Sequence, residues 1–140
     1  MMRRVTKTVL LTLLFVPVAI LLLFSAANAF RFAANQVAGQ SQTGTIVRRL
    51  SDSGAQVLGR YTFVGNVGGK GRHTDLYSAV LVRAEGDSRD IADLVSVDAH
   101  LVVSPCTSEN AKDFEEFFDF PTDTSGLFVV EVTSPAPFRE

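Results

Sequence analysis

Apolar residues run almost without a break near the start of the chain, whereas the rest of the sequence mixes apolar and polar positions. Between residues 9 and 27 only Thr12, Pro17 and Ser25 interrupt the apolar run. Since a helix rises about 1.5 Å per residue, roughly 20 such residues reach across the hydrocarbon core of a bilayer. The pattern therefore predicts a membrane anchor or signal helix in residues 1–29.

Two interpretations of this segment stay open. Three basic residues precede the apolar run, and the triplet from Ala27 to Ala29 is a small-x-small pattern, with cleavage before Phe30 or two residues earlier, before Asn28. These features are typical of a cleaved signal peptide. The length of the run instead favours an uncleaved anchor, which is the interpretation that we expect. Either way, the basic residues predict a cytoplasmic N-terminus and a C-terminal domain outside.

The pattern changes after the apolar run. Residues 30–43 are small and polar with little periodicity, and we expect them to form a linker close to the membrane. Residues 44–140 then form one extracytoplasmic domain, which is long enough to bury a modest hydrophobic core.

Strand-like patterns fill most of this domain. Residues 45–50 and 55–64 predict a first hairpin, and the apolar stretch 76–84 predicts a third strand. The clearest alternation of apolar and polar positions lies in residues 94–103, and residues 127–133 alternate again. About five strands, mostly antiparallel, are therefore expected.

The spacing of apolar side chains predicts which face of each element is buried. Alternation places Val57, Tyr61 and Phe63 on one face of the second predicted strand. It also places Phe128, Val130 and Val132 on one face of the last strand, and the apolar positions 95, 97, 99, 101 and 103 on one face of the strand over 94–103. After Pro105 the pattern is helical: over residues 108–118, Phe114, Phe117 and Phe118 lie three and four residues apart. We expect this helix to pack on the sheet through its phenylalanines. The fold class is α+β: an N-terminal transmembrane or signal helix, then a small, mostly antiparallel sheet with one packed helix.

Charge and cysteine content narrow the classes of function. Residues 30–140 hold 10 of the 13 basic residues and all 15 acidic ones, so their formal net charge is −5, which disfavours nucleic acid as a partner. Cys106 is the only cysteine, so the domain has no internal disulfide and depends on its hydrophobic core.

The most basic glycine-rich segment is residues 65–73. Glycines let backbone N–H groups approach an anion, and Lys70, Arg72 and His73 add positive charge. Phosphate-binding loops of this kind continue into a helix, whereas here a strand is predicted. A solvated hairpin loop is therefore the main interpretation, and an anion contact through Lys70, Arg72 and His73 is the alternative.

Groups that could carry catalysis or bind a metal are sparse. Asp98 and His100 leave the same side of their predicted strand, but two histidines and one cysteine in the whole chain supply few further ligands. Cys106 with His100 would be the one Cys–His pair, and no third orienting group is identifiable. Pairing of Cys106 with a partner's cysteine stays open. We predict no catalytic residue, no metal site and no cofactor, and the protein is not expected to be an enzyme.

Acidic residues gather around the phenylalanine-rich helix. Glu115, Glu116 and Asp119 lie largely outside its apolar stripe and offer a docking face for a protein partner or a second copy of the chain. We therefore expect a small single-pass membrane protein with an extracytoplasmic interaction domain, an accessory or assembly component of a membrane or envelope complex. The alternative is a secreted or periplasmic ligand- or anion-binding module released by signal-peptide cleavage.

Overall fold

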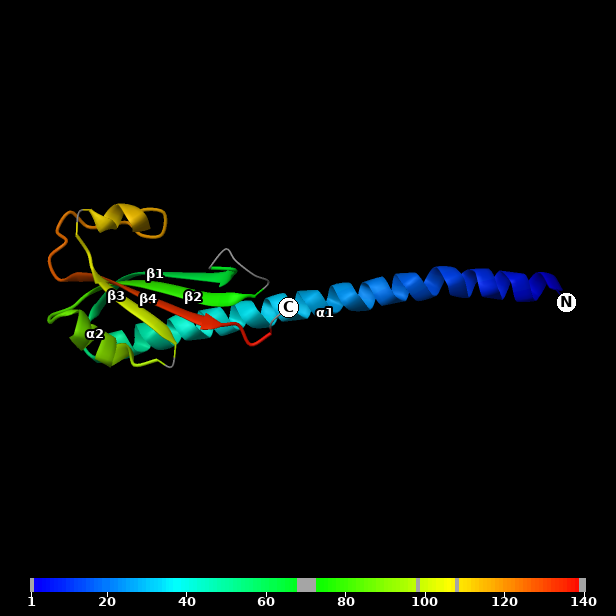
Figure 1. Ribbon diagram of the computed structural model, residues 1–140, viewed down its shortest axis with the longest axis horizontal. Coiled ribbons are helices and arrows are strands. Elements are labelled where there is room, and N and C mark those ends of the chain that lie inside the picture. Colours follow the sequence, from blue (N-terminus) through cyan, green and yellow to red (C-terminus); the bar gives the residue numbers. More distant parts are fainter. Residues whose placement is uncertain (1, 68–72, 98, 108, 139–140) are drawn as a thin grey trace. The chain divides into compact units, whose positions relative to one another are not determined.

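A computed structural model of the chain describes residues 2–67, 73–97, 99–107 and 109–138 (Figure 1). The chain divides into two compact units, Met1–Ala34 and Asn35–Glu140. Its elements, in chain order, are the helix α1 (Met2–Asp52), the strands β1 (Gln56–Gly65) and β2 (Asp75–Arg83), the helix α2 (Ser88–Val95), the strand β3 (His100–Pro105), the 3-10 helix η1 (Asn110–Phe114) and the strand β4 (Leu127–Pro135).

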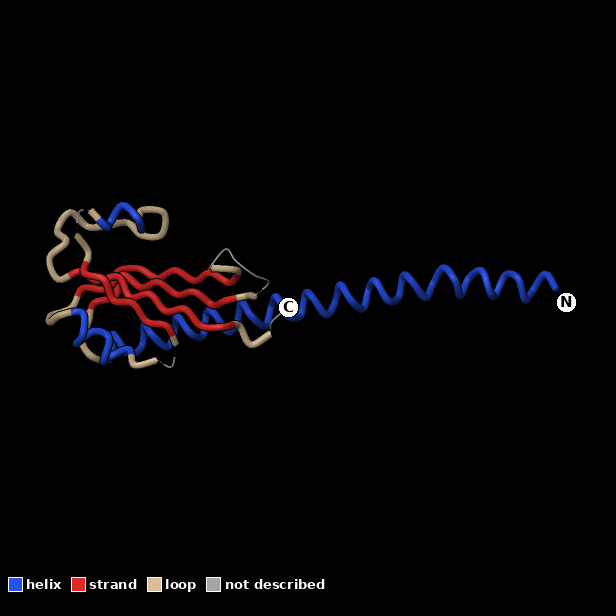
Figure 2. The backbone as a smooth tube through the Cα atoms, in the orientation of Figure 1, coloured by secondary structure: helices blue, strands red, loops and turns tan. Residues whose placement is uncertain are grey.

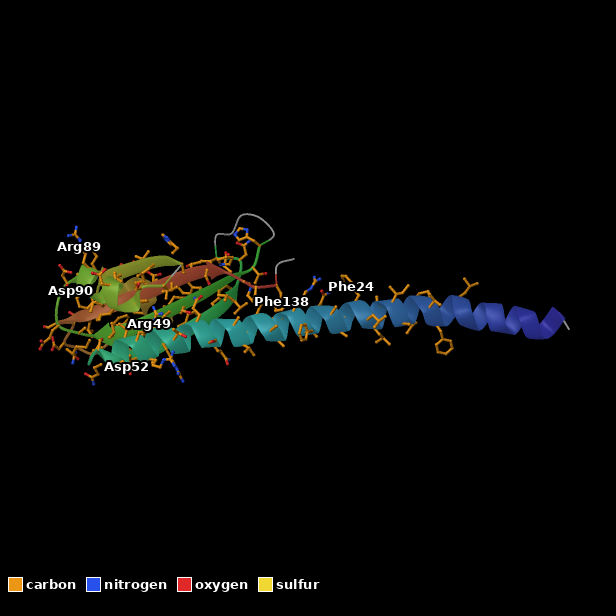
Figure 3. All side chains as sticks on the ribbon, turned by 90° about the horizontal axis from the view of Figure 1, so that it is seen from below. Phe24, Arg49, Asp52, Arg89, Asp90 and Phe138 are labelled. Atoms are coloured by element: carbon orange, nitrogen blue, oxygen red, sulfur yellow. The ribbon has the colours of Figure 1, made fainter. Side chains whose placement is uncertain are left out.

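The first unit is the N-terminal part of α1. Its apolar side chains are exposed from residue 15 onward; Leu23 is 71% exposed and Phe24, which is labelled in Figure 3, is 67% exposed. By length and composition this helix could cross a membrane, although a signal sequence would pass the same test. The prediction of one long apolar helix at the N-terminus is confirmed.

The second unit contains one antiparallel sheet with the strand order β1-β2-β4-β3 (Figure 1). The central strands are β2 and β4; Val80 of β2 pairs with Arg60 on one side and with Val130 on the other. On the far side of β4, Val130 pairs with Val103. The α+β class and the antiparallel sheet are confirmed, with four strands where about five were expected.

One face of the sheet is covered by residues 35–52 of α1 together with α2 (Figure 2). Every second residue of a strand points to the same side of the sheet. Apolar side chains from both helices pack against these alternate residues of the central strands. This first core consists of Ile46, Leu50, Val80, Val82, Ile91, Val95, Phe128, Val130 and Val132. The predicted grouping of Phe128, Val130 and Val132 is confirmed.

The opposite face is covered by the phenylalanine-rich segment that contains η1 (orange in Figure 1). This second core consists of Ala79, Leu81, Phe118 and Val129, with Tyr61, Tyr77, Phe114, Phe117 and Phe120 packed against it. A Cβ atom at Gly59 would lie 2.7 Å from the Phe118 ring, so the glycine is what lets this ring pack on β1. Packing through the phenylalanines is confirmed. Of the helix expected over residues 108–118, residue 108 lies outside the described residues, and the rest forms a short 3-10 helix followed by further turns.

Two expectations for the region before β1 are wrong. Residues 30–43 are helical, not a linker, and residues 45–50 are helical, not a strand; both stretches belong to α1. For residues 45–50 the physical reason is the spacing of the apolar residues, because Ile46 and Leu50 stand four residues apart and so share the face that packs in the first core.

Between residues 35 and 43, α1 meets the sheet through small and polar side chains. The Asn35 amide donates to the Phe138 carbonyl at 2.9 Å and accepts from the Phe138 N–H at 3.2 Å. Thr43 Oγ1 lies 2.7 Å from Ser78 Oγ, and Gln42 Nε2 donates to the same Ser78 oxygen at 3.0 Å. These bonds satisfy polar groups that burial would otherwise leave without water.

The expected strand over residues 94–103 is wrong in its first half, where α2 ends and a loop follows. Asp87 begins α2: its carboxylate accepts from the N–H groups of Arg89 and Asp90, while the Asp90 carboxylate accepts from the Asp87 N–H. This capping box favours a helix over a strand. At the other end of α2, the Arg49 guanidinium donates to the carbonyls of Val95 and Ser96, where a positive charge is favourable (Figure 3). The alternating apolar residues 95, 97, 99, 101 and 103 nevertheless all contact the first core.

The faces of β1 also differ from expectation. Tyr61 and Phe117 both pack against the second core, but Val57 packs against the first core. A register shift between Val57 and Gly59 reverses the side to which the strand turns its residues. The prediction that Val57 shares a face with Tyr61 is therefore wrong.

Candidate functional site

The phenylalanine-rich segment leaves part of its face of the sheet open. Beside Phe117 lies a cleft of about 430 Å³, which we call the aromatic cleft; it is lined by Tyr61, Phe63, Asn66, Val67, Tyr77, Phe117 and Glu131. The pairing of β1 with β2 sets Phe63 opposite Tyr77, and Phe63 is 41% exposed. Aromatic surface on a folded unit is therefore open to solvent here.

Three rings form the wall of the aromatic cleft. The Tyr61 and Phe117 ring centroids are 4.3 Å apart with an angle of 32° between the planes. Tyr61 and Tyr77 meet edge to face at 6.4 Å and 65°. Such tilted and edge-to-face pairs are the favourable geometries for aromatic rings, so they hold one another in place.

A carboxylate stands among these rings. Tyr61, Ala79 and Glu131 follow one another in a row across β1, β2 and β4, so only the small Ala79 side chain lies between the tyrosine and the carboxylate. The Tyr77 hydroxyl donates a 2.6 Å hydrogen bond to Glu131 Oε1. Burial, and then this hydrogen bond and the negative charge of Glu131, raise the pKa of Tyr77 far above its ordinary value, which keeps the hydroxyl protonated as a donor.

The Glu131 carboxylate has no cationic partner within the described part of the chain. The ion pair found there joins His73 to Asp75. Glu131 is half-buried on β4, where its neighbours in sequence, Val130 and Val132, are buried in the first core. A charge held among rings without a counter-ion gains from any cation that can reach it.

The predicted anion contact is only partly within the described residues. Lys70 and Arg72 lie outside them. His73 is exposed, and its Nε2 lies 3.4 Å from the Asp75 carboxylate. That carboxylate competes with an external anion for the imidazole, and the anion contact stays a prediction.

The predicted docking face lies next to the aromatic cleft along the chain. Glu115, Glu116 and Asp119 are all exposed; we call them the acidic segment. Glu116 immediately precedes Phe117, which lines the cleft, so the acidic segment adjoins the aromatic cleft along the chain.

Of the other candidates within the described residues, neither Cys106 nor His100 lines this cleft. Cys106 is buried with Ala111 and Leu127, and this burial raises the pKa of its thiol, which opposes formation of a thiolate nucleophile. His100 is exposed on β3, and Asp98 lies outside the described residues. Within the described ranges, no cluster of three or more His, Cys, Asp or Glu side chains is arranged to hold a metal ion.

The sequence alone does not identify Tyr61, Tyr77 and Glu131 as members of one site. Their approach depends on the register of three strands, which no pattern within a single strand reveals. One clue was present, because Glu131 is the only charged residue within an otherwise apolar and small strand. A charge in such a position often marks a feature other than the core.

Comparison of this chain with protein-family models, with curated proteins and with solved structures gives no significant match.

Proposed function

We propose that this chain is a small single-pass membrane protein whose extracytoplasmic domain binds a protein partner, as an accessory or assembly component of a membrane or envelope complex. One observation carries the proposal: α1 has exposed apolar side chains as far as Phe32 and a face buried against the sheet from Asn35 onward. Exposure of these apolar side chains to water would cost about 25 cal/mol of free energy per Å² of apolar surface, and burial in lipid removes this cost.

The distribution of charge supports the orientation. Arg3, Arg4 and Lys7 precede the apolar run, and Arg31 is the one basic residue close behind it. An excess of basic residues before a spanning helix favours a cytoplasmic N-terminus, which leaves the second unit outside.

A binding role is supported by what the sheet leaves uncovered. The aromatic cleft and the acidic segment lie on the face that α1 and α2 do not cover. Exposed aromatic side chains are enriched at the centres of protein interfaces, and charges around them select the partner.

The membrane anchor is tested by alkaline carbonate extraction of the full chain, combined with N-terminal sequencing. We expect the chain in the membrane pellet with its first residues intact. Leu21→Arg with Leu22→Arg should release it, because each arginine costs about 2.5 to 3.5 kcal/mol at the centre of a spanning helix. Val37→Arg is the matched control, since Val37 is 67% exposed on the same helix but follows the apolar run. An N-terminus at Phe30 or Asn28 would contradict the anchor and favour a released ligand-binding module.

The binding role is tested by the size of the assembly on native gels of gently solubilised membranes. We expect Glu115→Lys, Glu116→Lys and Asp119→Lys together to reduce the large species while the melting temperature stays close to that of the wild type. Asp93→Lys, a change at an exposed acidic residue on α2, should leave the large species intact. Equal assembly in both variants would contradict docking through the acidic segment.

A further inference from the structure

We infer that the aromatic cleft binds the cationic end of an arginine or lysine side chain presented by the partner protein, with Glu131 as its counter-ion. The inference rests on the proposed function, since it names the chemistry of the partner at the open face of the sheet. It joins three properties of the cleft: its rings, its single charge and the charge of its surroundings.

The rings suit a cation. Tyr61, Phe63, Tyr77 and Phe117 contribute four aromatic side chains to one cleft. The face of an aromatic ring carries partial negative charge and attracts a guanidinium or ammonium group that comes within about 6 Å of the ring centre. The alkyl part of the same basic side chain can lie along the remaining apolar wall.

The carboxylate suits the same cation. Among the described residues, Glu131 is the only charged residue that lines the aromatic cleft. Its Oε1 accepts from the Tyr77 hydroxyl, which fixes the carboxylate, and a carboxylate has lone pairs on both oxygens, so Oε2 can accept a further donor. A charged donor makes the strongest hydrogen bond with a carboxylate, and an arginine adds a planar fork that can stack on a ring.

The surroundings select a basic partner rather than an anionic surface. The residues of the acidic segment lie within two positions of Phe117 in the sequence, and their three side chains are exposed. Together with Glu131 they attract a basic peptide segment and repel phosphate-bearing groups. The partner is therefore a protein with an exposed arginine or lysine, not an acidic peptide or a free anion.

The chain carries its own reporter for this cleft. It has two tyrosines and no tryptophan, and both tyrosines line the aromatic cleft. Intrinsic fluorescence of the full chain in detergent micelles therefore comes from the proposed site itself. The probe is the peptide Gly-Gly-Arg-Gly-Gly amide, and its matched control carries citrulline, which keeps the planar shape of arginine without the charge.

We expect the arginine peptide to change tyrosine emission saturably and the citrulline peptide to bind at least about ten-fold more weakly. Glu131→Gln, which keeps an acceptor for Tyr77, should weaken arginine-peptide binding by a similar factor, and Asp93→Asn should leave it unchanged. Equal binding of the two peptides, or unchanged affinity in Glu131→Gln, would overturn the inference.

Two further outcomes test who occupies the cleft. Binding seen only in Lys70→Ser with Arg72→Ser would overturn the partner as occupant, because basic residues of the chain itself would then compete for the site. A shift of emission on transfer from micelles to phosphatidylcholine nanodiscs, without peptide, would assign the cleft to a lipid headgroup and also overturn it. The carbonate and native-gel tests are independent of the peptide test. A chain that stays in membranes and assembles but does not bind the peptide would refute only the proposed occupant of the cleft. A chain that binds the peptide but is extracted from the membrane would refute only the proposed anchor.

Discussion

Phe117 and Phe118 are neighbours in sequence with different surroundings. Phe118 is 7% exposed and packs on Gly59 and Leu81, whereas Phe117 is half-buried against Tyr61 at the aromatic cleft. Truncation of a buried phenylalanine costs about 3 to 5 kcal/mol, a large part of the roughly 5 to 15 kcal/mol that stabilises a domain, and a buried charge costs more. We expect Phe118→Asp to abolish cooperative thermal unfolding followed by circular dichroism, and Phe117→Ala to leave a folded chain.

The matched controls for this change are Glu115→Lys and Glu116→Lys, which alter exposed residues of the same segment. Both variants should melt close to the wild type, because surface substitutions usually change stability by less than about 0.5 kcal/mol. A Phe118→Asp chain with an unchanged melting temperature would show that the second core does not support the sheet.

Tyr77 gives a prediction for pH. Burial and the Glu131 carboxylate raise its pKa above the ordinary value of about 10, so the folded chain holds the phenolic proton more tightly than the unfolded chain. This contribution to stability is complete below about pH 10 and is lost as pH rises toward the pKa of the folded state. In a Tyr61→Phe chain, absorbance at 295 nm should therefore report ionisation of Tyr77 at higher pH in buffer than in denaturant. Coincident titrations in the two solvents would contradict the burial of Tyr77 and its bond to Glu131.

At the scale of elements, the docking of α1 depends on close approach at Gly39. A Cβ atom there would lie 2.9 Å from a Val64 methyl group and 3.1 Å from a Thr62 methyl group. We expect Gly39→Val to lower the free energy of unfolding, because the helix must move off the sheet or strain its neighbours. At Gly44 nothing lies within 4 Å of the added carbon, so Gly44→Ala should raise stability by about 0.5 to 1 kcal/mol through helix propensity. Equal effects of the two changes in denaturant titrations would contradict this docking.

The same part of α1 shows why the sequence predicted the sheet better than the helices. Strands can be predicted from the sequence because alternate residues are apolar wherever one face of the strand is buried. Residues 35–43 bury Asn35, Gly39 and Thr43. Asn35 bonds to the backbone of Phe138, and Thr43 lies against sheet hydroxyl groups, so the buried face of this helix carries no apolar period to detect. Complementarity between two polar surfaces becomes visible only when both are in place.

The helix α2 was missed for a different reason. It spans eight residues, and its two buried residues, Ile91 and Val95, fit the end of a turn and the start of a strand equally well. The pair Asp87 and Asp90 was the available clue, since acidic groups three residues apart can form a capping box. Prediction of the aromatic cleft would have required the register of the strands and the position of the bulge in β1, because these decide which residues share a face.

At the scale of the whole molecule, the boundary between the compact units predicts which fragment is stable. Residues 35–43 contribute Asn35, Gln42 and Thr43 to contacts with the sheet and the C-terminal segment. We expect a fragment of residues 35–140 to unfold cooperatively in urea and a fragment of residues 44–140 to be markedly less stable, because Ser78 and its neighbours would lose buried hydrogen bonds. Equal urea midpoints for the two fragments would place the boundary at residue 44 instead.

The paired hydrogen bonds between Asn35 and Phe138 also determine how far apart residues 35 and 138 lie. They hold residue 138 beside residue 35, the first residue of the second unit. Although the unit contains more than 100 residues, the path through it returns to its starting point. The first residue of the second unit and residue 138 are therefore held together, however long the path between them. A group attached at residue 138 is kept close to residue 35, at the start of the unit.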